Sequence, residues 1–197
     1  MKLKPDAHGL AIVKLVDLER ARNAAGLIGL LDSDLAGRRG GLPIRGRAAL
    51  ALARISSPTA AEHIAPLVSD PLEKVRFDAV VALGRIGDRG SCRALLPATR
   101  DESEDVRMAA ARSLGECRCV EARDVLLAML GERDWGFRVH AAEALCELPA
   151  GHDIVKGIEA ALAKGRPWSR GRRRLVRALV RARVSEEQAV ASDKRSS

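Results

Sequence analysis

The sequence predicts an all-α fold, a right-handed α-solenoid of about five helix hairpins followed by a capping helix. The main observation is a pattern that recurs at a constant offset of 31 residues, since segment 75–84 returns as 106–115. Further copies begin at Ile44 and at Phe137, each again 31 residues away from its neighbour. A fixed period of about 20 to 50 residues is typical of stacked structural repeats.

Each repeat is expected to form two helices. In the repeat that starts at Asp70, apolar residues recur at three- and four-residue spacing between Val75 and Ile86, which places them on one buried helix stripe. We expect Asp70 to cap this helix, with Pro71 at its first position. Gly87 ends it, and a second apolar run then forms the partner helix. A single hairpin buries too little apolar surface to fold alone, so the hairpins must stack.

The predicted elements follow the repeat along the chain. An atypical first hairpin is separated from the second by a Gly-rich segment, which we interpret as a surface loop rather than an anion-binding turn. After the last hairpin, Leu175 and Leu179 indicate a capping helix, and the final polar segment is expected to be disordered. The boundaries are 6–31, 43–69, 70–100, 101–131 and 134–163 for the hairpins, 167–183 for the capping helix and 184–197 for the tail.

The repeated motif has the form Asp-x5-Arg, then Ala-x-x-Ala-Leu-Gly, then a Gly-Asp turn. Over roughly residues 40 to 180, this motif resembles the HEAT repeats of the short, phycobilin-lyase-like class. The resemblance implies an armadillo-like helical scaffold more often than an enzyme, although a fold alone does not determine function. It also implies a ladder of Arg and Asp side chains between successive repeats, formed by Arg45, Arg76, Asp101, Arg107 and Arg138.

Composition excludes several classes of protein. The chain has two Phe, two Trp and no Tyr, so platforms for stacking bases or sugars are nearly absent. No segment approaches the roughly 18 apolar residues needed to span a bilayer, and no apolar run follows the N-terminal lysines as in a signal peptide. We therefore expect a cytoplasmic protein without a membrane span.

No arrangement of residues indicates a catalytic or metal site. The four histidines fall in different repeats. The Cys117-x-Cys119 spacing matches no zinc signature, and we interpret these two residues, with Cys92 and Cys146, as packing side chains. The expectation is a protein with no catalytic residue, no metal and no cofactor.

Positive charge is concentrated in one segment. The formal net charge is +8, yet residues 1–163 contain 23 basic and 23 acidic groups, and residues 164–183 contain nine basic groups and no acidic one. On a helix, Arg170, Arg174, Arg177 and Arg181 form one stripe. This stripe fits either a docking site for an acidic macromolecule or a solubilising end cap, and the sequence leaves both open.

These observations favour a non-enzymatic protein-interaction scaffold that binds another protein through the second helices and the basic helix. If the basic helix takes part in binding, we expect that protein to be acidic. The expected contacts are Arg93, Arg123, Lys156, Arg170, Arg173, Arg174, Arg177 and Arg181. A first alternative is a nucleic-acid-binding protein, such as one that resembles the HEAT-like alkylpurine DNA glycosylases. Those enzymes hold a damaged base with Trp, Arg and Asp side chains, and the comparable residues here are Asp134, Trp135, Arg138 and Trp168. A second alternative is a lyase-like or chaperone-like subunit that needs a partner.

Overall fold

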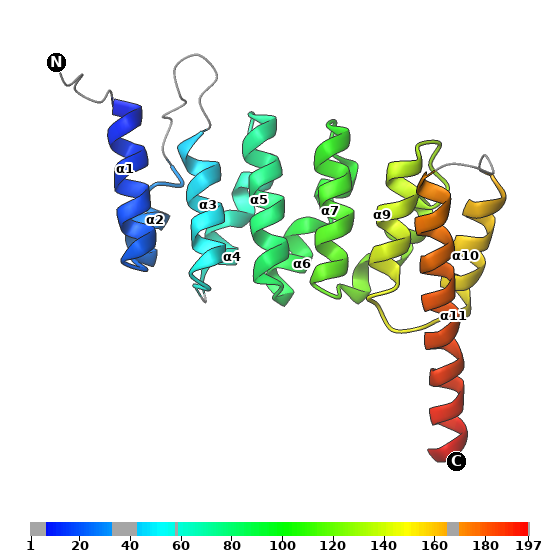
Figure 1. Cartoon of the computed structure of the whole chain (residues 1–197). Coiled ribbons are helices and arrows are strands. Elements are labelled where there is room, and N and C mark those ends of the chain that lie inside the picture. The colour runs from blue at the N-terminus through cyan, green and yellow to red at the C-terminus, as the bar shows by residue number, and fades with distance from the viewer. Residues whose placement is uncertain (1–6, 33–42, 58, 165–169, 197) are drawn as a thin grey trace. The chain divides into compact units, whose positions relative to one another are not determined.

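The structure is a computed structural model that describes residues 7–32, 43–57, 59–164 and 170–196. All regular secondary structure within these ranges is helical, and no strand occurs among them (Figure 1). The all-α prediction is therefore confirmed. None of the helices in the described ranges is both long and apolar enough to cross a membrane.

From α1 to α8, long and short helices alternate along the chain. The first helices of successive hairpins are α1 (Ala7–Arg20), α3 (Ile44–Arg54), α5 (Glu73–Ile86), α7 (Glu104–Glu116) and α9 (Trp135–Leu145). Their partners are α2 (Ala24–Ile28), α4 (Ala60–Ile64) with the 3-10 helix η1 (Ala65–Ser69), α6 (Arg89–Leu95) with η2 (Pro97–Arg100), η3 (Val120–Ala122) with α8 (Arg123–Met129), and α10 (His152–Ala163). The last helix is α11 (Arg170–Ser196).

The chain divides into two compact units, residues 1–113 and 114–197, with the boundary inside α7. In the first unit, α3 packs between α1 and α5, and α4 lies against α2 and α6 (Figure 1). The first helices thus form one layer and the second helices another. In the second unit, α9 packs against α8, α10 and α11.

The 31-residue period is a period of burial. Three positions of each first helix are at most 4% exposed in all four regular repeats, one β-branched or aromatic, one alanine and one leucine. The alanines let neighbouring helices approach closely, while the leucines fill the space between the layers. These sets are Ile44, Val75, Val106 and Phe137; Ala48, Ala79, Ala110 and Ala141; and Leu52, Leu83, Leu114 and Leu145.

The turn residues of the repeat act mostly as predicted. Gly87 ends α5 in a left-handed conformation (φ 70°), and the carboxylate of Asp88 accepts a hydrogen bond from the Ser91 amide at the start of α6. The expectation that Asp70 caps α5 is wrong, since that helix begins only at Glu73. Asp70 instead accepts the Leu72 amide in the preceding turn, and Arg45 holds its carboxylate.

The prediction that residues 184–197 form a disordered tail is wrong for the described part, because α11 continues to Ser196. It extends past the ends of α9 and α10 (Figure 1). Two features explain the continuation. Glu186, Glu187, Gln188 and Ala189 are strong helix formers, and His152 of α10 holds Glu186 across a 2.9 Å contact between Nδ1 and Oε1.

Candidate functional site

Two arginines of the repeat motif, Arg45 and Arg76, each hold an aspartate that lies 25 residues further along the chain. Arg45 Nε and Nη2 lie 2.5 and 2.9 Å from the two carboxylate oxygens of Asp70. Arg76 binds Asp101 in the same bidentate way at 2.8 and 3.0 Å, and also contacts Glu102. Each pair therefore joins one hairpin to the next with the geometry that a guanidinium and a carboxylate prefer.

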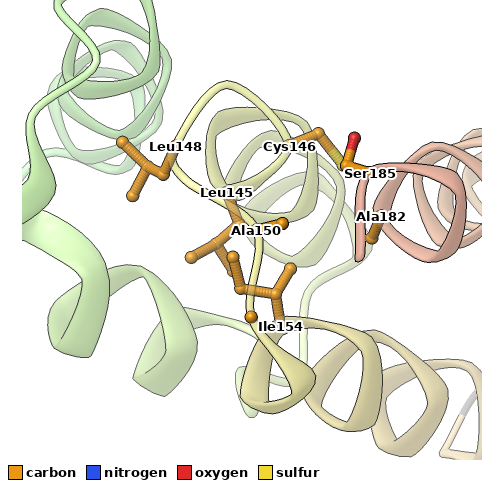
Figure 2. A pocket seen from close by; sticks show the side chains of 8 residues that line it. Leu145, Cys146, Leu148, Ala150, Ile154, Ala182 and Ser185 are labelled. Carbon is orange, nitrogen blue, oxygen red and sulfur yellow. The ribbon is translucent and has the colours of Figure 1, made fainter. Parts of the chain in front are cut away.

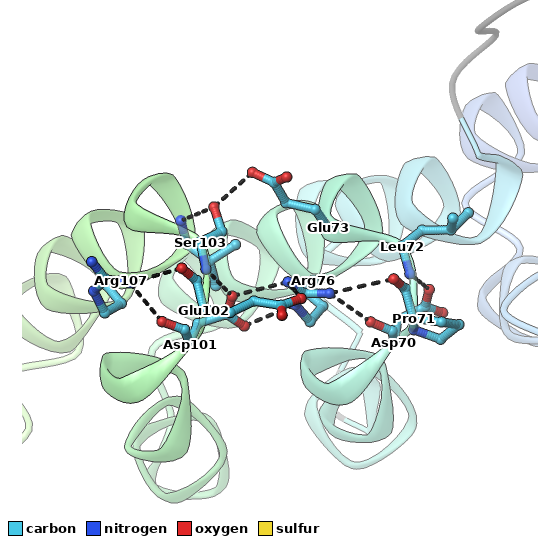
Figure 3. A network of polar contacts seen from close by, with 10 residues as sticks. Asp70, Pro71, Leu72, Glu73, Arg76, Asp101, Glu102, Ser103 and Arg107 are labelled. Atoms are coloured by element: carbon cyan, nitrogen blue, oxygen red, sulfur yellow. Dashed lines mark hydrogen bonds and ion pairs between the residues drawn. The ribbon is translucent and has the colours of Figure 1, made fainter.

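Two arginines of the motif, Arg76 and Arg107, also bind the main chain of their own repeat. Arg76 Nη1 donates to the carbonyl oxygen of Asp70 at 3.1 Å, and Arg107 Nη1 donates to the carbonyl of Asp101 at 2.7 Å (Figure 3). Each aspartate is thus held twice, through its carboxylate by the preceding repeat and through its carbonyl by its own. We call these contacts the Arg–Asp ladder, and we propose that its role is to set the register between hairpins.

Burial makes the ladder sensitive to protonation. The side chains of Arg76 and Asp101 are each 8% exposed, and that of Asp70 is 5% exposed. Burial acts to raise the pKa of both aspartates, but hydrogen bonds from an arginine and a backbone amide, together with the nearby guanidinium charges, lower it further than burial raises it. The pKa of Arg76 is raised, chiefly by its hydrogen bond to Asp101.

The pKa of each of these carboxyl groups is lower in the folded chain than its ordinary value of 3.8, so ionisation stabilises the fold at every pH above about 3.8. This stabilisation is lost as the pH falls through the lowered pKa. We expect the free energy of unfolding, measured by urea titration, to fall steeply between about pH 5 and pH 2. In Asp101→Asn the free energy of unfolding should fall less steeply with decreasing pH. An unchanged pH dependence would mean that Asp101 does not contribute to it.

Arg138 departs from the ladder pattern. The residue 25 positions later is Ala163, which has no carboxylate. The Arg138 guanidinium instead donates to the carbonyls of Ala161, at 3.3 Å, and Glu132, and lies over the ring of Trp135 at 5.3 Å. Arg138 is thus tied to backbone within the second unit.

The described residues of the set compared with a DNA glycosylase act at the start of α9. Asp134 Oδ1 accepts the Gly136 amide at 2.6 Å and so caps α9, while Trp135 and Arg138 stack on each other. Trp168 lies outside the described residues. The described members of this set therefore stabilise the start of α9.

The expected partner-binding residues on the second helices differ in availability. Arg93 on α6 and Lys156 on α10 are exposed. Arg123 on α8 is held by both carboxylate oxygens of Asp153, at 2.8 and 2.9 Å, and by the carbonyl of Pro149. Burial tends to raise the pKa of Asp153, but Arg123 lowers it overall. Arg123 therefore joins α8 to the start of α10.

Much of the basic stripe on α11 is neutralised inside the second unit. Arg174 forms a bidentate pair with Glu143 at 2.8 and 2.6 Å, and Arg181 lies 2.7 Å from Glu147. Arg183 pairs with Glu159 of α10. The sequence does not reveal these three ion pairs, because each glutamate is separated from its arginine by 24 to 34 residues. Arg173 and Arg177 are exposed, and the Arg170 side chain lies outside the described part.

A small cavity lies between the end of α9, the start of α10 and α11 (Figure 2). It is lined by Leu145, Cys146, Ile154 and Ala182, among others, and its volume of about 10 Å³ has room for about one water molecule. Burial raises the pKa of the Cys146 thiol to about 11, and this thiol lies 3.3 Å from the carbonyl of Ala178. A thiol protonated at neutral pH in so small a space is a packing group.

Comparison with known proteins agrees with this geometry. A family model for HEAT repeats matches residues 43–100 and 93–180. No curated protein sequence matches the chain.

Two solved structures with TM-scores above 0.5 show the same fold. An engineered protein from the Northeast Structural Genomics Consortium superposes with a TM-score of 0.62 at 23% identity, covering 91% of this chain and 86% of that one. A designed armadillo repeat protein in complex with the peptide (KR)4 gives 0.61 at 19% identity, covering 85% of each chain. The complex of CpcE and CpcF of phycocyanin lyase from Nostoc sp. PCC7120 gives 0.43 at 17% identity, covering 91% of each. The fold is an α-solenoid.

Proposed function

This chain belongs to the HEAT-repeat family, and from that premise we propose that it is a non-enzymatic scaffold that binds another protein through its second helices. The proposal rests on how the described side chains are used. The buried pairs Arg45–Asp70 and Arg76–Asp101 join one hairpin to the next, while the second helices of the first unit present charged groups of both signs to solvent.

The perturbed carboxyl groups support a structural use. Asp70, Asp101 and Asp153 are those whose pKa is clearly lowered in the described part of the chain, and each is held by an arginine from another helix. A catalytic acid or base needs a pKa close to the working pH. Carboxylates held permanently ionised by a guanidinium are suited to joining helices instead.

The observation that carries the proposal is the exposed surface of α4 with η1 and of α6 with η2, which lie side by side. We call it the second-helix surface. Pro66 and Pro97 lie one repeat apart and are exposed at the point where each second helix changes to a 3-10 turn. The two repeats therefore present a proline at the same position of this surface. Charged and polar groups of both kinds surround them, namely Glu62, His63, Arg93 and Arg100. A mixed surface favours a protein ligand over a phosphate backbone, which requires continuous positive charge.

The ion pairs of α11 weaken the nucleic-acid alternative. Affinity for a phosphate backbone depends on the number of arginines and lysines that can release its counterions. Three arginines of α11 are already neutralised by Glu143, Glu147 and Glu159, so a phosphate would have to displace a carboxylate at each. A lyase-like or chaperone-like subunit is a separate alternative that would also bind its partner protein through an exposed surface.

Site-specific crosslinking tests the second-helix surface directly. A photo-reactive phenylalanine analogue placed at position 93 in the full chain and irradiated in living cells should give a discrete adduct that mass spectrometry identifies as protein. The matched control is position 85, since Arg85 is also exposed but lies on the first helix α5. Identical products from both positions, or an adduct to nucleic acid at position 93, would contradict the proposal.

A further inference from the structure

The outward face of α11 carries the spacing of a coiled-coil seam. Its residues alternate at four- and three-residue steps, which keeps them in line along a helix. All six are exposed, and Val180 and Val184 at the centre are 57% and 46% exposed. The opposite face, with Leu175, Ala178 and Ala182, is buried in the second unit. The seam consists of Arg173, Arg177, Val180, Val184, Glu187 and Ala191.

The second half of α11 has little of its own chain to pack against. From Arg183 to Lys194, every residue except Glu186 is exposed, and Figure 1 shows this part of the helix extending past α9 and α10. A helix of this length without tertiary contacts is marginal in water. A second surface that covers the seam would supply the missing burial.

The seam also contains charged side chains that form no ion pair within the described part of this chain. Arg174, Arg181 and Arg183 lie toward α9 and α10 and each has a glutamate partner. By contrast, neither Arg177 nor Glu187 forms an ion pair with any residue in the described ranges. One charge of each sign is therefore available, at opposite ends of the apolar centre.

This pattern is complementary to itself when one copy is reversed. If Val180 of one helix lies against Val184 of an antiparallel copy, the residues three positions outward are Arg177 on one helix and Glu187 on the other. A twofold axis repeats this arrangement, so one contact gives two valine pairs and two ion pairs. In a parallel pair the arginines would face each other, and so would the glutamates. The charges thus select the antiparallel orientation.

We propose that the seam of α11 is a self-association surface, and that its occupant is the seam of a second copy of this chain in antiparallel orientation. Because a single helix pair buries less than the roughly 1,600 Å² of a standard interface, the dimer is weak, with a dissociation constant on the order of 10 μM. Self-association is independent of whether the second-helix surface binds a partner.

Sedimentation equilibrium of the full chain from about 1 to 200 μM tests the proposal, since this range brackets the expected dissociation constant. The mean mass should rise from the monomer, 21.1 kDa, toward the dimer. Val180→Asp should abolish the rise, while Val13→Asp, at a residue 56% exposed on α1, should leave it unchanged. If the wild-type chain stays monomeric throughout the range, the proposal is overturned and the seam is available to a helix of another protein. Equal self-association of the two variants would also overturn it.

A charge exchange tests the orientation without depending on folding. Arg177→Glu and Glu187→Arg should each weaken the dimer at least ~10-fold, because each places like charges opposite one another. Mixed in equal amounts, the two variants should associate with nearly the wild-type dissociation constant, since every Glu at 177 or 187 then meets an Arg. Failure of the mixture to associate more tightly than either variant alone would overturn the antiparallel arrangement.

Discussion

Replacing Arg76 with methionine is expected to lower the free energy of unfolding by about 3–5 kcal/mol. Methionine keeps much of the aliphatic volume but leaves the Asp101 carboxylate, only 8% exposed, without its bidentate partner. The variant also loses donors to the carbonyls of Asp70 and Pro71. Urea unfolding followed by circular dichroism measures the loss.

Arg85→Met is the matched control, because Arg85 lies on the same helix but is exposed. It should change stability by less than about 0.5 kcal/mol. Equal effects of the two substitutions would mean that loss of an α5 arginine in general, and not the ladder, sets the cost.

Gly115→Ala is expected to destabilise the chain by about 3 kcal/mol, the upper end for overpacking, although alanine is the better helix former by about 1 kcal/mol. A Cβ atom at position 115 would lie 2.6 Å from the Cα and 2.8 Å from the Cβ of Ala144 on α9. Since a backbone atom cannot rotate away, α7 and α9 must separate locally. Thermal unfolding of the variant should show a melting temperature several degrees lower.

Gly29→Ala is the control for this prediction. A Cβ atom there meets only carbonyl oxygens at 3.6 and 3.7 Å, and the backbone (φ −62°) is one that alanine adopts freely. We expect it to be neutral, or stabilising by up to about 1 kcal/mol. If Gly115→Ala changed stability as little as Gly29→Ala, the close contact between Gly115 of α7 and Ala144 of α9 would be contradicted.

The repeat period was the part of the fold that sequence could predict. An offset of 31 residues identified the residues that are now seen to be buried, such as Ala79 and Ala110. It also showed that Gly84 and Gly115 recur. The reason for the glycines required coordinates, because the atoms they accommodate, in Ser113 and Ala144, belong to the next first helix. Local pattern reveals a buried stripe but not which neighbour fills the space beside it.

Long-range pairs were the part that sequence could not predict. The ladder was expected only through a family resemblance, and the partners of Arg174 and Arg181 were not expected at all. An arginine stripe on an isolated helix looks like an empty binding site, whereas packing against α9 and the turn after it supplies Glu143 and Glu147. The continuation of α11 was missed for a related reason, since its polar end has helix-forming residues but no apolar period.

The central claim is that the Arg–Asp ladder joins successive hairpins in a fixed register. A double-mutant cycle on Arg76→Met and Asp101→Leu measures that link most directly. Because removing both charges leaves no buried ion unpaired, the double variant should be more stable than Arg76→Met alone, with a coupling free energy of at least about 2 kcal/mol. Additive effects, with a coupling below about 0.5 kcal/mol, would contradict the claim.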